Sequence, residues 1–208
     1  MTMILDSDRP EAIEQAAELI RLGNLVAFPT DTLYGVGADI SNPAAIEKLY
    51  RAKNRSKDKG IPILIADGVD VDNIAASIPS EARTIIKKFW PGPLTLILQK
   101  REDLASGLSP NQGIAVRVPG NPIARRLIRA AGGAIAASSA NQSGSDPALT
   151  ANQALIALRG SIAAVLDGGP VEFGVASTIL DFTTDPPRIV RQGPISAVDL
   201  EVGEVVPA

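Results

Sequence analysis

The 208-residue chain contains no histidine and no cysteine. These two absences remove the commonest general base, the thiol nucleophile and the soft metal ligands. They also exclude a disulfide framework and any serine–histidine pair. If the chain is an enzyme, we expect it to work by placing cations and hydrogen-bond donors around a charged reactant, as phosphate-transfer sites do.

Aromatic residues are few, and the net charge is small. Aromatic side chains make up 3% of the sequence, against 45% hydrophobic residues, so the core of one domain must be aliphatic. The formal net charge of −3 gives no global attraction to nucleic acid or to an anionic membrane. Acidic residues occur within the first few positions of the N-terminus, which is not typical of a signal peptide or a membrane anchor. No apolar run is long enough to span a bilayer. We therefore expect a cytoplasmic protein without membrane contact.

Apolar runs alternate with helix-like patterns along the chain, which is typical of the α/β class. Strands are predicted at 25–28, 61–66, 94–98 and 114–118 and around 165, 179 and 189; helices are predicted after Asp8 and Asn42, over 80–90, after Asn121, and from Thr150 through Leu158. Because the last strands follow one another without helices, we expect a mixed sheet. The chain is predicted to be one domain, 1–208, with its core at about 8–196 and a C-terminal tail at 197–208.

The segment from Lys48 to Lys59 carries six basic residues and one acid. Lys53 and Arg55 are two apart, so at a helix end both could reach one ligand and hold adjacent phosphate oxygens. The alternative is a solvated basic helix end, which the helix dipole favours in any case. Charge alone favours this second interpretation.

The run from Ser138 to Gly144 follows an apolar strand, AIAA. Ligands of open α/β sheets bind beyond the carboxyl ends of strands, and small side chains let the backbone approach a nucleotide. The alternative is an ordinary turn in which Ser and Asn bond to the local backbone. Similarly, the run from Pro29 to Gly37 follows a strand, and its hydroxyls, its carboxylate and its flexible glycines suit a small polar ligand. The alternative is a turn with an Asx-type bond from Asp31.

Two arginines stand within or beside late strands. Arg117 interrupts the apolar strand IAVRVP, and if buried it needs an acidic partner or an anionic ligand; otherwise it faces solvent or is ion-paired. Ser177, within Gly174–Thr178, and Arg191 could add hydrogen-bond donors, or could be plain turn and edge positions.

Several common sites are missing. The chain has no Walker loop and no Rossmann glycine fingerprint, and its acids are scattered, so no dedicated metal site is expected. Magnesium would have to arrive on the phosphates of a nucleotide.

Six ordered motifs carry a family resemblance: PTDTLYGVG, K-N-R with KGIPILIA, AVRVP, SSANQSG, GVASTILDF and IVRQGPIS. Together they resemble the YrdC-like family from the first predicted strand to Ile195. The resemblance implies a twisted mixed sheet with flanking helices around a positively charged cavity. The implied activity is that of a single-domain threonylcarbamoyl-AMP synthase, which joins L-threonine, bicarbonate and ATP to give threonylcarbamoyl-AMP, pyrophosphate and water. That product would serve separate tRNA-modifying threonylcarbamoyl transferase partners.

The resemblance also implies roles for individual residues. The family pattern K-x-R…S-x-N falls on the implied catalytic residues Lys53, Arg55, Ser139 and Asn141. The implied L-threonine contacts are Thr32, Arg117 and Ser177, and the implied ATP contacts are Arg55, Lys59, Asn141, Thr150 and Arg191.

One departure concerns the amine substrate. Many relatives carry a histidine that can touch threonine, and the aligned position here is Leu64. An alternative is therefore a nucleotide-binding paralogue that acts on another amine. A second alternative is a double-stranded RNA-binding module, whose only sequence support is the basic segment from Lys48 to Lys59.

Overall fold

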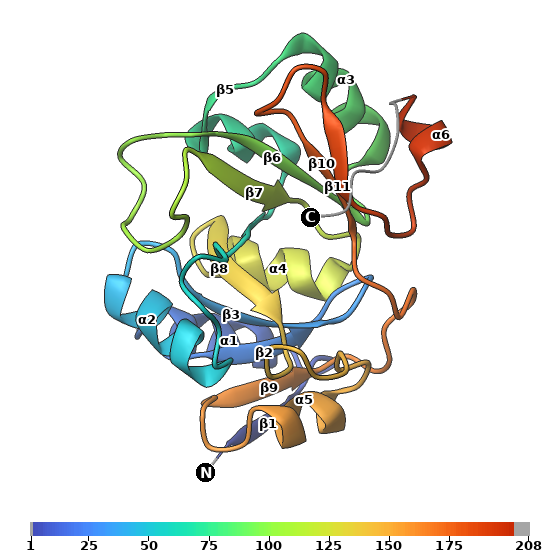
Figure 1. The fold of residues 1–208 in the computed structure, drawn as a ribbon. Coiled ribbons are helices and arrows are strands. Elements are labelled where there is room, and N and C mark those ends of the chain that lie inside the picture. The colour runs from blue at the N-terminus through green and yellow to red at the C-terminus, as the bar shows by residue number, and fades with distance from the viewer. Residues whose placement is uncertain (1, 202–208) are drawn as a thin grey trace.

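The computed structural model describes residues 2–201, which form one sheet of eleven strands with helices on both faces (Figure 1). The strands are β1 (Met3–Asp6), β2 (Val26–Pro29), β3 (Tyr34–Asp39), β4 (Ile63–Ile65), β5 (Ala75–Ser77), β6 (Leu94–Lys100), β7 (Gly113–Arg117), β8 (Ala134–Ser139), β9 (Ala164–Asp167), β10 (Thr178–Asp181) and β11 (Arg188–Arg191). The helices are α1 (Ala12–Arg21), α2 (Pro43–Ala52), α3 (Ser80–Phe89), α4 (Pro122–Ala130), α5 (Ala151–Ala157), α6 (Ala197–Leu200) and a 3-10 helix, η1 (Gly68–Asn73).

The sheet has the order β1-β9-β2-β3-β8-β4-β7-β6-β10-β11, with β5 beside β6. Four pairs are parallel, β1 with β9, β2 with β9, β4 with β7, and β6 with β10, and the other pairs are antiparallel. The predicted mixed sheet in an α/β fold is confirmed. In Figure 1 the sheet turns from β1 and β9 at the bottom of the view to β10 and β11 at the top.

Side chains alternate between two hydrophobic clusters on opposite faces of the central strands. In β2, Val26 and Phe28 join the cluster under α1 and α4, whereas Ala27 joins the larger cluster that includes the apolar face of α2. The sheet is thus buried on both sides near its middle. None of the helices within residues 2–201 is long and apolar enough to cross a membrane.

Capping residues set three of the predicted helix starts. Asn42 and Asn121 each accept two backbone N–H bonds and precede a proline at the first helical position, and Thr150 accepts the N–H of Gln153. The predicted cap at Asp8 is wrong, because α1 begins at Ala12 with Glu11 before it. Asp8 instead lies in the turn that follows β1.

Three strands were not predicted: β1, β3 and β5. The segment of β3 was interpreted as a loop because it contains Gly35 and Gly37. These glycines lie in a crowded strand, since a Cβ at Gly37 would come within 2.9 Å of Ile135 Cδ1 and 3.0 Å of the Phe28 ring. The core also extends beyond 8–196, because β1 pairs with β9 and a short helix, α6, begins the predicted tail. The rest of that tail, 202–208, lies outside the described residues.

Candidate active site

A cavity of about 230 Å³ opens at the middle of the sheet. Strands β3, β4, β6, β7, β8, β10 and β11 and the loops beside them contribute its walls. Its polar lining comprises Thr30, Thr32, Tyr34, Arg55, Thr95, Arg117, Ser138, Ser139, Ser177 and Arg191, and Leu64 adds an apolar wall. The lining therefore carries three arginines and no carboxylate.

Two of these arginines have no acidic partner. Arg55 donates from Nε to the carbonyl oxygen of Lys59 at 3.0 Å and from Nη2 to that of Gly60 at 2.8 Å. Arg191, at the rim, donates to the carbonyl oxygen of Ser177 at 3.0 Å and to its Oγ at 3.2 Å. Within residues 2–201, no carboxylate lies within 4.0 Å of either guanidinium group. Both are held in place by neutral acceptors, and neither forms an ion pair within residues 2–201.

The three cations also influence one another. Desolvation, followed by the charges of Arg117 and Arg55, lowers the pKa of Arg191 from its ordinary value. Mutual repulsion of this kind is relieved when an anion binds between the cations. The cavity is therefore suited to a ligand with several negative charges, such as a polyphosphate.

Arg117 is a different case, because its charge is already balanced. It is buried, and its Nη2 lies 2.6 Å from Asp31 Oδ1 in an ion pair whose side chains are 7% and 3% exposed. It also donates to Thr32 Oγ1 at 2.8 Å and to the carbonyl oxygen of Gly92 at 2.9 Å. The acidic partner that a buried Arg117 was expected to need is thus Asp31, and the solvent-facing alternative is wrong.

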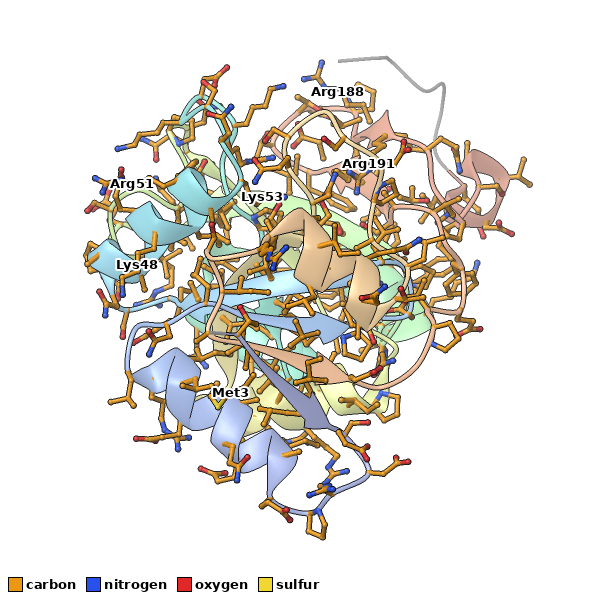
Figure 2. The ribbon with its side chains drawn as sticks, turned by 90° about the horizontal axis from the view of Figure 1, so that it is seen from below. Met3, Lys48, Arg51, Lys53, Arg188 and Arg191 are labelled. Carbon is orange, nitrogen blue, oxygen red and sulfur yellow. The ribbon has the colours of Figure 1, made fainter. Side chains whose placement is uncertain are left out.

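Lys53 lies behind the cavity wall and not in it. Only 2% of the residue is exposed, and its Nζ donates to the carbonyl oxygens of Ser139 and of Asn141, the latter at 2.7 Å. Figure 2 places Lys53 at the inner end of α2, with Lys48 and Arg51 further out. The Lys53 side chain therefore links the C-terminal end of α2 to the end of β8 by hydrogen bonds. The alternative interpretation of a solvated basic helix end is wrong for this residue. Its predicted phosphate contact stays a prediction.

This buried amine predicts a pH-dependent stability. Burial, followed by the charge of Arg55, lowers the pKa of Lys53 from 10.5 to about 8. Between these values the unfolded chain binds more protons than the folded chain, so the free energy of unfolding should rise with pH. Urea unfolding at about pH 7.5 and about pH 9.5 should show the wild type gaining at least about 1 kcal/mol relative to Lys53→Met.

The matched control for that measurement is Lys59→Met, which removes an exposed lysine from the same segment. The control should follow the wild type at both pH values. Equal pH dependence of the wild type and Lys53→Met would contradict the depressed pKa.

Ser139 and Asn141 sit where β8 ends. Ser139 lines the cavity, opposite Gly35 in the β3–β8 pairing. Asn141 is 8% exposed and donates from Nδ2 to the carbonyl oxygen of Ser145 at 2.6 Å, while its buried Oδ1 has no hydrogen-bond partner among the described residues. An orphaned buried acceptor is costly, so a ligand that donates a hydrogen bond to Asn141 would relieve that cost.

Comparison with known proteins identifies the family. The family model described as "Telomere recombination", for Sua5, YciO and YrdC proteins, matches residues 18–193. The chain belongs to the Sua5/YciO/YrdC family.

Several relatives of this family are similar over nearly the whole chain. A threonylcarbamoyl-AMP synthase of Bacillus subtilis is 41% identical over 202 residues, which cover 95% of this chain and 57% of the relative. One of Pyrococcus abyssi is 39% identical over 196 residues, covering 93% of this chain and 58% of the relative. The chain thus spans less than two thirds of the length of these two relatives.

Solved structures share the fold. Sua5 of P. abyssi complexed with L-threonine superposes with a TM-score of 0.92 at 37% identity, over 100% of this chain and 62% of that one. YciO of E. coli superposes with a TM-score of 0.85 at 25% identity, over 96% of this chain and 98% of that one. The resemblance to YrdC-like proteins predicted from the motifs is therefore confirmed.

The structure brings together only some of the residues that the family motifs select. Thr32, Arg55, Arg117, Ser139, Ser177 and Arg191 line the cavity. Lys59 is exposed and contributes its backbone carbonyl to Arg55, and Thr150 caps α5. Their contacts with ATP stay predictions.

The sequence did not identify Thr95 as a site residue. Its Oγ1 lies 2.8 Å from Ser177 Oγ, and both side chains are buried in the cavity wall. A hydroxyl within the apolar strand LTLIL was the available signal, because a buried polar group needs a partner.

The basic segment that supported RNA binding does not form one free basic surface. Lys48 donates to the carbonyl oxygen of Gly23, and Arg51 and Lys57 both pair with Glu47. Lys53 is buried as well, so most of these basic side chains already bond to groups of the protein and are not free to contact RNA phosphates.

A metal centre was not expected from the sequence. In residues 2–201, no three His, Cys, Asp or Glu side chains are grouped so that they could hold a metal ion.

Proposed function

We propose that this chain is an L-threonylcarbamoyladenylate synthase, a nucleotidyltransferase that condenses L-threonine, bicarbonate and ATP. The observation that carries the proposal is the cavity in which Arg55 and Arg191, which have no ion-pair partner within residues 2–201, lie beside the hydroxyls of Thr32 and Ser177. A site of this kind suits one polyanion and one small polar molecule. The L-threonine in the P. abyssi Sua5 structure and the names of the relatives support the same choice.

The proposed chemistry needs no protein nucleophile. The threonine amine condenses with bicarbonate and forms a carbamate with loss of one water; if bicarbonate first loses that water as carbon dioxide, the amine adds to the carbon dioxide and releases a proton. A carbamate oxygen then attacks the α-phosphorus of ATP, and pyrophosphate leaves with the electrons of the broken P–O bond. Such a step depends on alignment and charge neutralisation, which a chain without histidine and cysteine can supply.

The geometry supports a division of roles. Arg55 and Arg191 would neutralise the triphosphate, and magnesium would arrive with ATP as its counter-ion. The Asn141 Oδ1 acceptor would take a hydrogen bond from the nucleotide, and Thr32, Ser177 and the Arg117 wall would hold L-threonine. The product would pass to a tRNA-modifying threonylcarbamoyl transferase complex in the cytoplasm.

Pyrophosphate release tests this proposal. With ATP, magnesium and bicarbonate, we expect release that depends on L-threonine and is at least about 10-fold slower with L-serine, which lacks one methyl group. Release with a different amine alone would favour a paralogue, and no release with any amine would contradict the proposed activity.

A further inference from the structure

The turn that follows β11 is held against β10 by hydrogen bonds to one buried side chain. Thr178 is 0% exposed, and its Oγ1 donates to the carbonyl oxygen of Ile195 at 2.7 Å. The same oxygen accepts the backbone N–H groups of Gly193 at 3.0 Å and of Ile195 at 3.1 Å. A threonine hydroxyl has one proton and two lone pairs, so these three bonds use its whole capacity. Thr178 therefore binds this turn and has no bond left for a ligand.

The same turn lies directly against the backbone at the start of β10. A Cβ at Gly193 would lie 2.3 Å from the carbonyl oxygen of Ala176 and 2.4 Å from the backbone nitrogen of Thr178. Distances this short are impossible for a real Cβ, so only glycine allows this approach. The motif IVRQGPIS thus packs on the motif GVASTILDF through the backbone of Gly193 and the hydroxyl of Thr178.

The pairing of β10 with β11 does not by itself fix the position of Arg191. Ile179 faces Arg191 in this antiparallel pair, but Leu180 faces Ile189, so the register shifts and β11 carries Val190 as an extra residue. A bulge of this kind interrupts the ladder locally and bends the strand. Arg191 is the last residue of β11 and comes directly after the bulge. Its backbone therefore depends on the turn that follows it.

Arg191 carries its charge from this position to the rim of the cavity. Its guanidinium group donates to the carbonyl oxygen of Ser177 at 3.0 Å and to Ser177 Oγ at 3.2 Å. No carboxylate of residues 2–201 lies within 4.0 Å to hold it there. Ordering a long side chain costs conformational entropy, and a backbone that is already fixed lowers what remains to be ordered when a ligand binds.

We propose that Thr178 is a positioning residue for Arg191: it anchors the turn 192–195 to β10 and so holds the Arg191 guanidinium group at the rim, ready for an anionic group of the substrate. This inference rests on the proposed function, in which Arg191 neutralises the triphosphate of ATP. It adds a residue that touches no ligand. Without the Thr178 hydroxyl the turn loses three hydrogen bonds, and Arg191 has to be ordered as ATP binds, which weakens the binding.

The test measures the dissociation constant of ATP with magnesium by calorimetry. Thr178→Val keeps the shape of the side chain without its hydroxyl and should weaken binding about 5-fold, approaching the loss of about 10-fold expected for Arg191→Ala. Thr178→Ser keeps the three hydrogen bonds and should stay within about 2-fold of the wild type. The matched control, Thr183→Val, removes a hydroxyl that bonds to Asp181 at 2.6 Å at the other end of the same hairpin, and it should also stay within about 2-fold.

A double-mutant cycle separates positioning from a general loss of structure. If Thr178 acts through Arg191, adding Thr178→Val to Arg191→Ala should weaken ATP binding by no more than about 2-fold further. A general structural role would give the full loss in both backgrounds. Additive losses, normal ATP binding by Thr178→Val, or a loss in Thr178→Ser equal to that in Thr178→Val would each overturn the inference.

A second measurement needs no variant and applies even if Thr178→Val fails to fold. Because Thr178 accepts the amides of Gly193 and Ile195, both should exchange their hydrogens at least about 10-fold more slowly than free peptide amides, as followed by NMR. Exchange at the free-peptide rate would overturn the anchoring of the turn.

The proposed function is judged separately, by pyrophosphate release from the wild type. If the wild type binds ATP but turns over no amine, the proposed function fails, and the double-mutant cycle on ATP binding still decides the inference.

Discussion

Replacing Arg55 by alanine should lower the rate of pyrophosphate release at least about 10-fold and leave the fold intact. Arg55 lines the cavity and is held by the carbonyl oxygens of Lys59 and Gly60, and it forms no ion pair with a carboxylate in the part of the chain that the structure describes. Its removal therefore takes away attraction for the ligand without leaving an acid unpaired. Steady-state kinetics at saturating L-threonine, with a melting curve of each variant, would measure both effects.

Two further variants serve as comparisons for Arg55→Ala. Arg51→Ala removes an arginine whose side chain is 78% exposed and paired with Glu47, and it should leave the rate within about 2-fold. Arg55→Lys keeps the charge but loses the planar fork, so an intermediate rate is expected. Near-normal turnover by Arg55→Ala would remove Arg55 from the phosphate site.

Replacing Arg117 by methionine should cost about 3–5 kcal/mol of stability, the largest effect expected on the fold. The substitution leaves Asp31 buried at 4% exposure, with the N–H of Gly120 on one carboxylate oxygen and no partner on the other. A buried charge that loses its counter-ion is strongly destabilising, even where the intact pair contributes little. Urea unfolding of the wild type and the variant measures the loss.

A double-mutant cycle isolates the ion pair. Asp31→Asn alone leaves Arg117 as the uncompensated charge, whereas the double variant buries neither charge. The double variant should therefore be at least about 1 kcal/mol more stable than the sum of the single losses predicts. Additive losses would mean that Asp31 and Arg117 do not interact in the folded protein.

Local chemistry made the helices largely predictable. Asparagine followed by proline at 42–43 and at 121–122 satisfies the free N–H groups of the first turn, so these two helix starts could be predicted. Strand β3 could not, because Gly35 and Gly37 are typical of loops in isolation. Their place in a strand depends on Phe28, a side chain from the neighbouring β2.

The candidate site was predictable as a set of residues but not as a set of contacts. Arg55, Ser139 and Arg191 could be selected from motifs, and all three line one cavity. The orientation of Lys53 towards two backbone carbonyls depends on how the end of α2 meets the end of β8, which are 86 residues apart in the chain. The pairing of Asp31 with Arg117 spans the same separation. Such long-range contacts leave no periodic signal in a sequence.

The central claim is that this cavity joins a threonine-derived carbamate to AMP. Mass spectrometry of the nucleotide formed from L-threonine, ATP, magnesium and ¹³C-labelled bicarbonate tests it most directly, with rapid quenching because the mixed anhydride is labile. The account predicts an AMP adduct that contains threonine and one ¹³C atom, formed in step with pyrophosphate and absent when L-threonine is omitted. Pyrophosphate release without a labelled adduct, or a labelled adduct that lacks threonine, would contradict it.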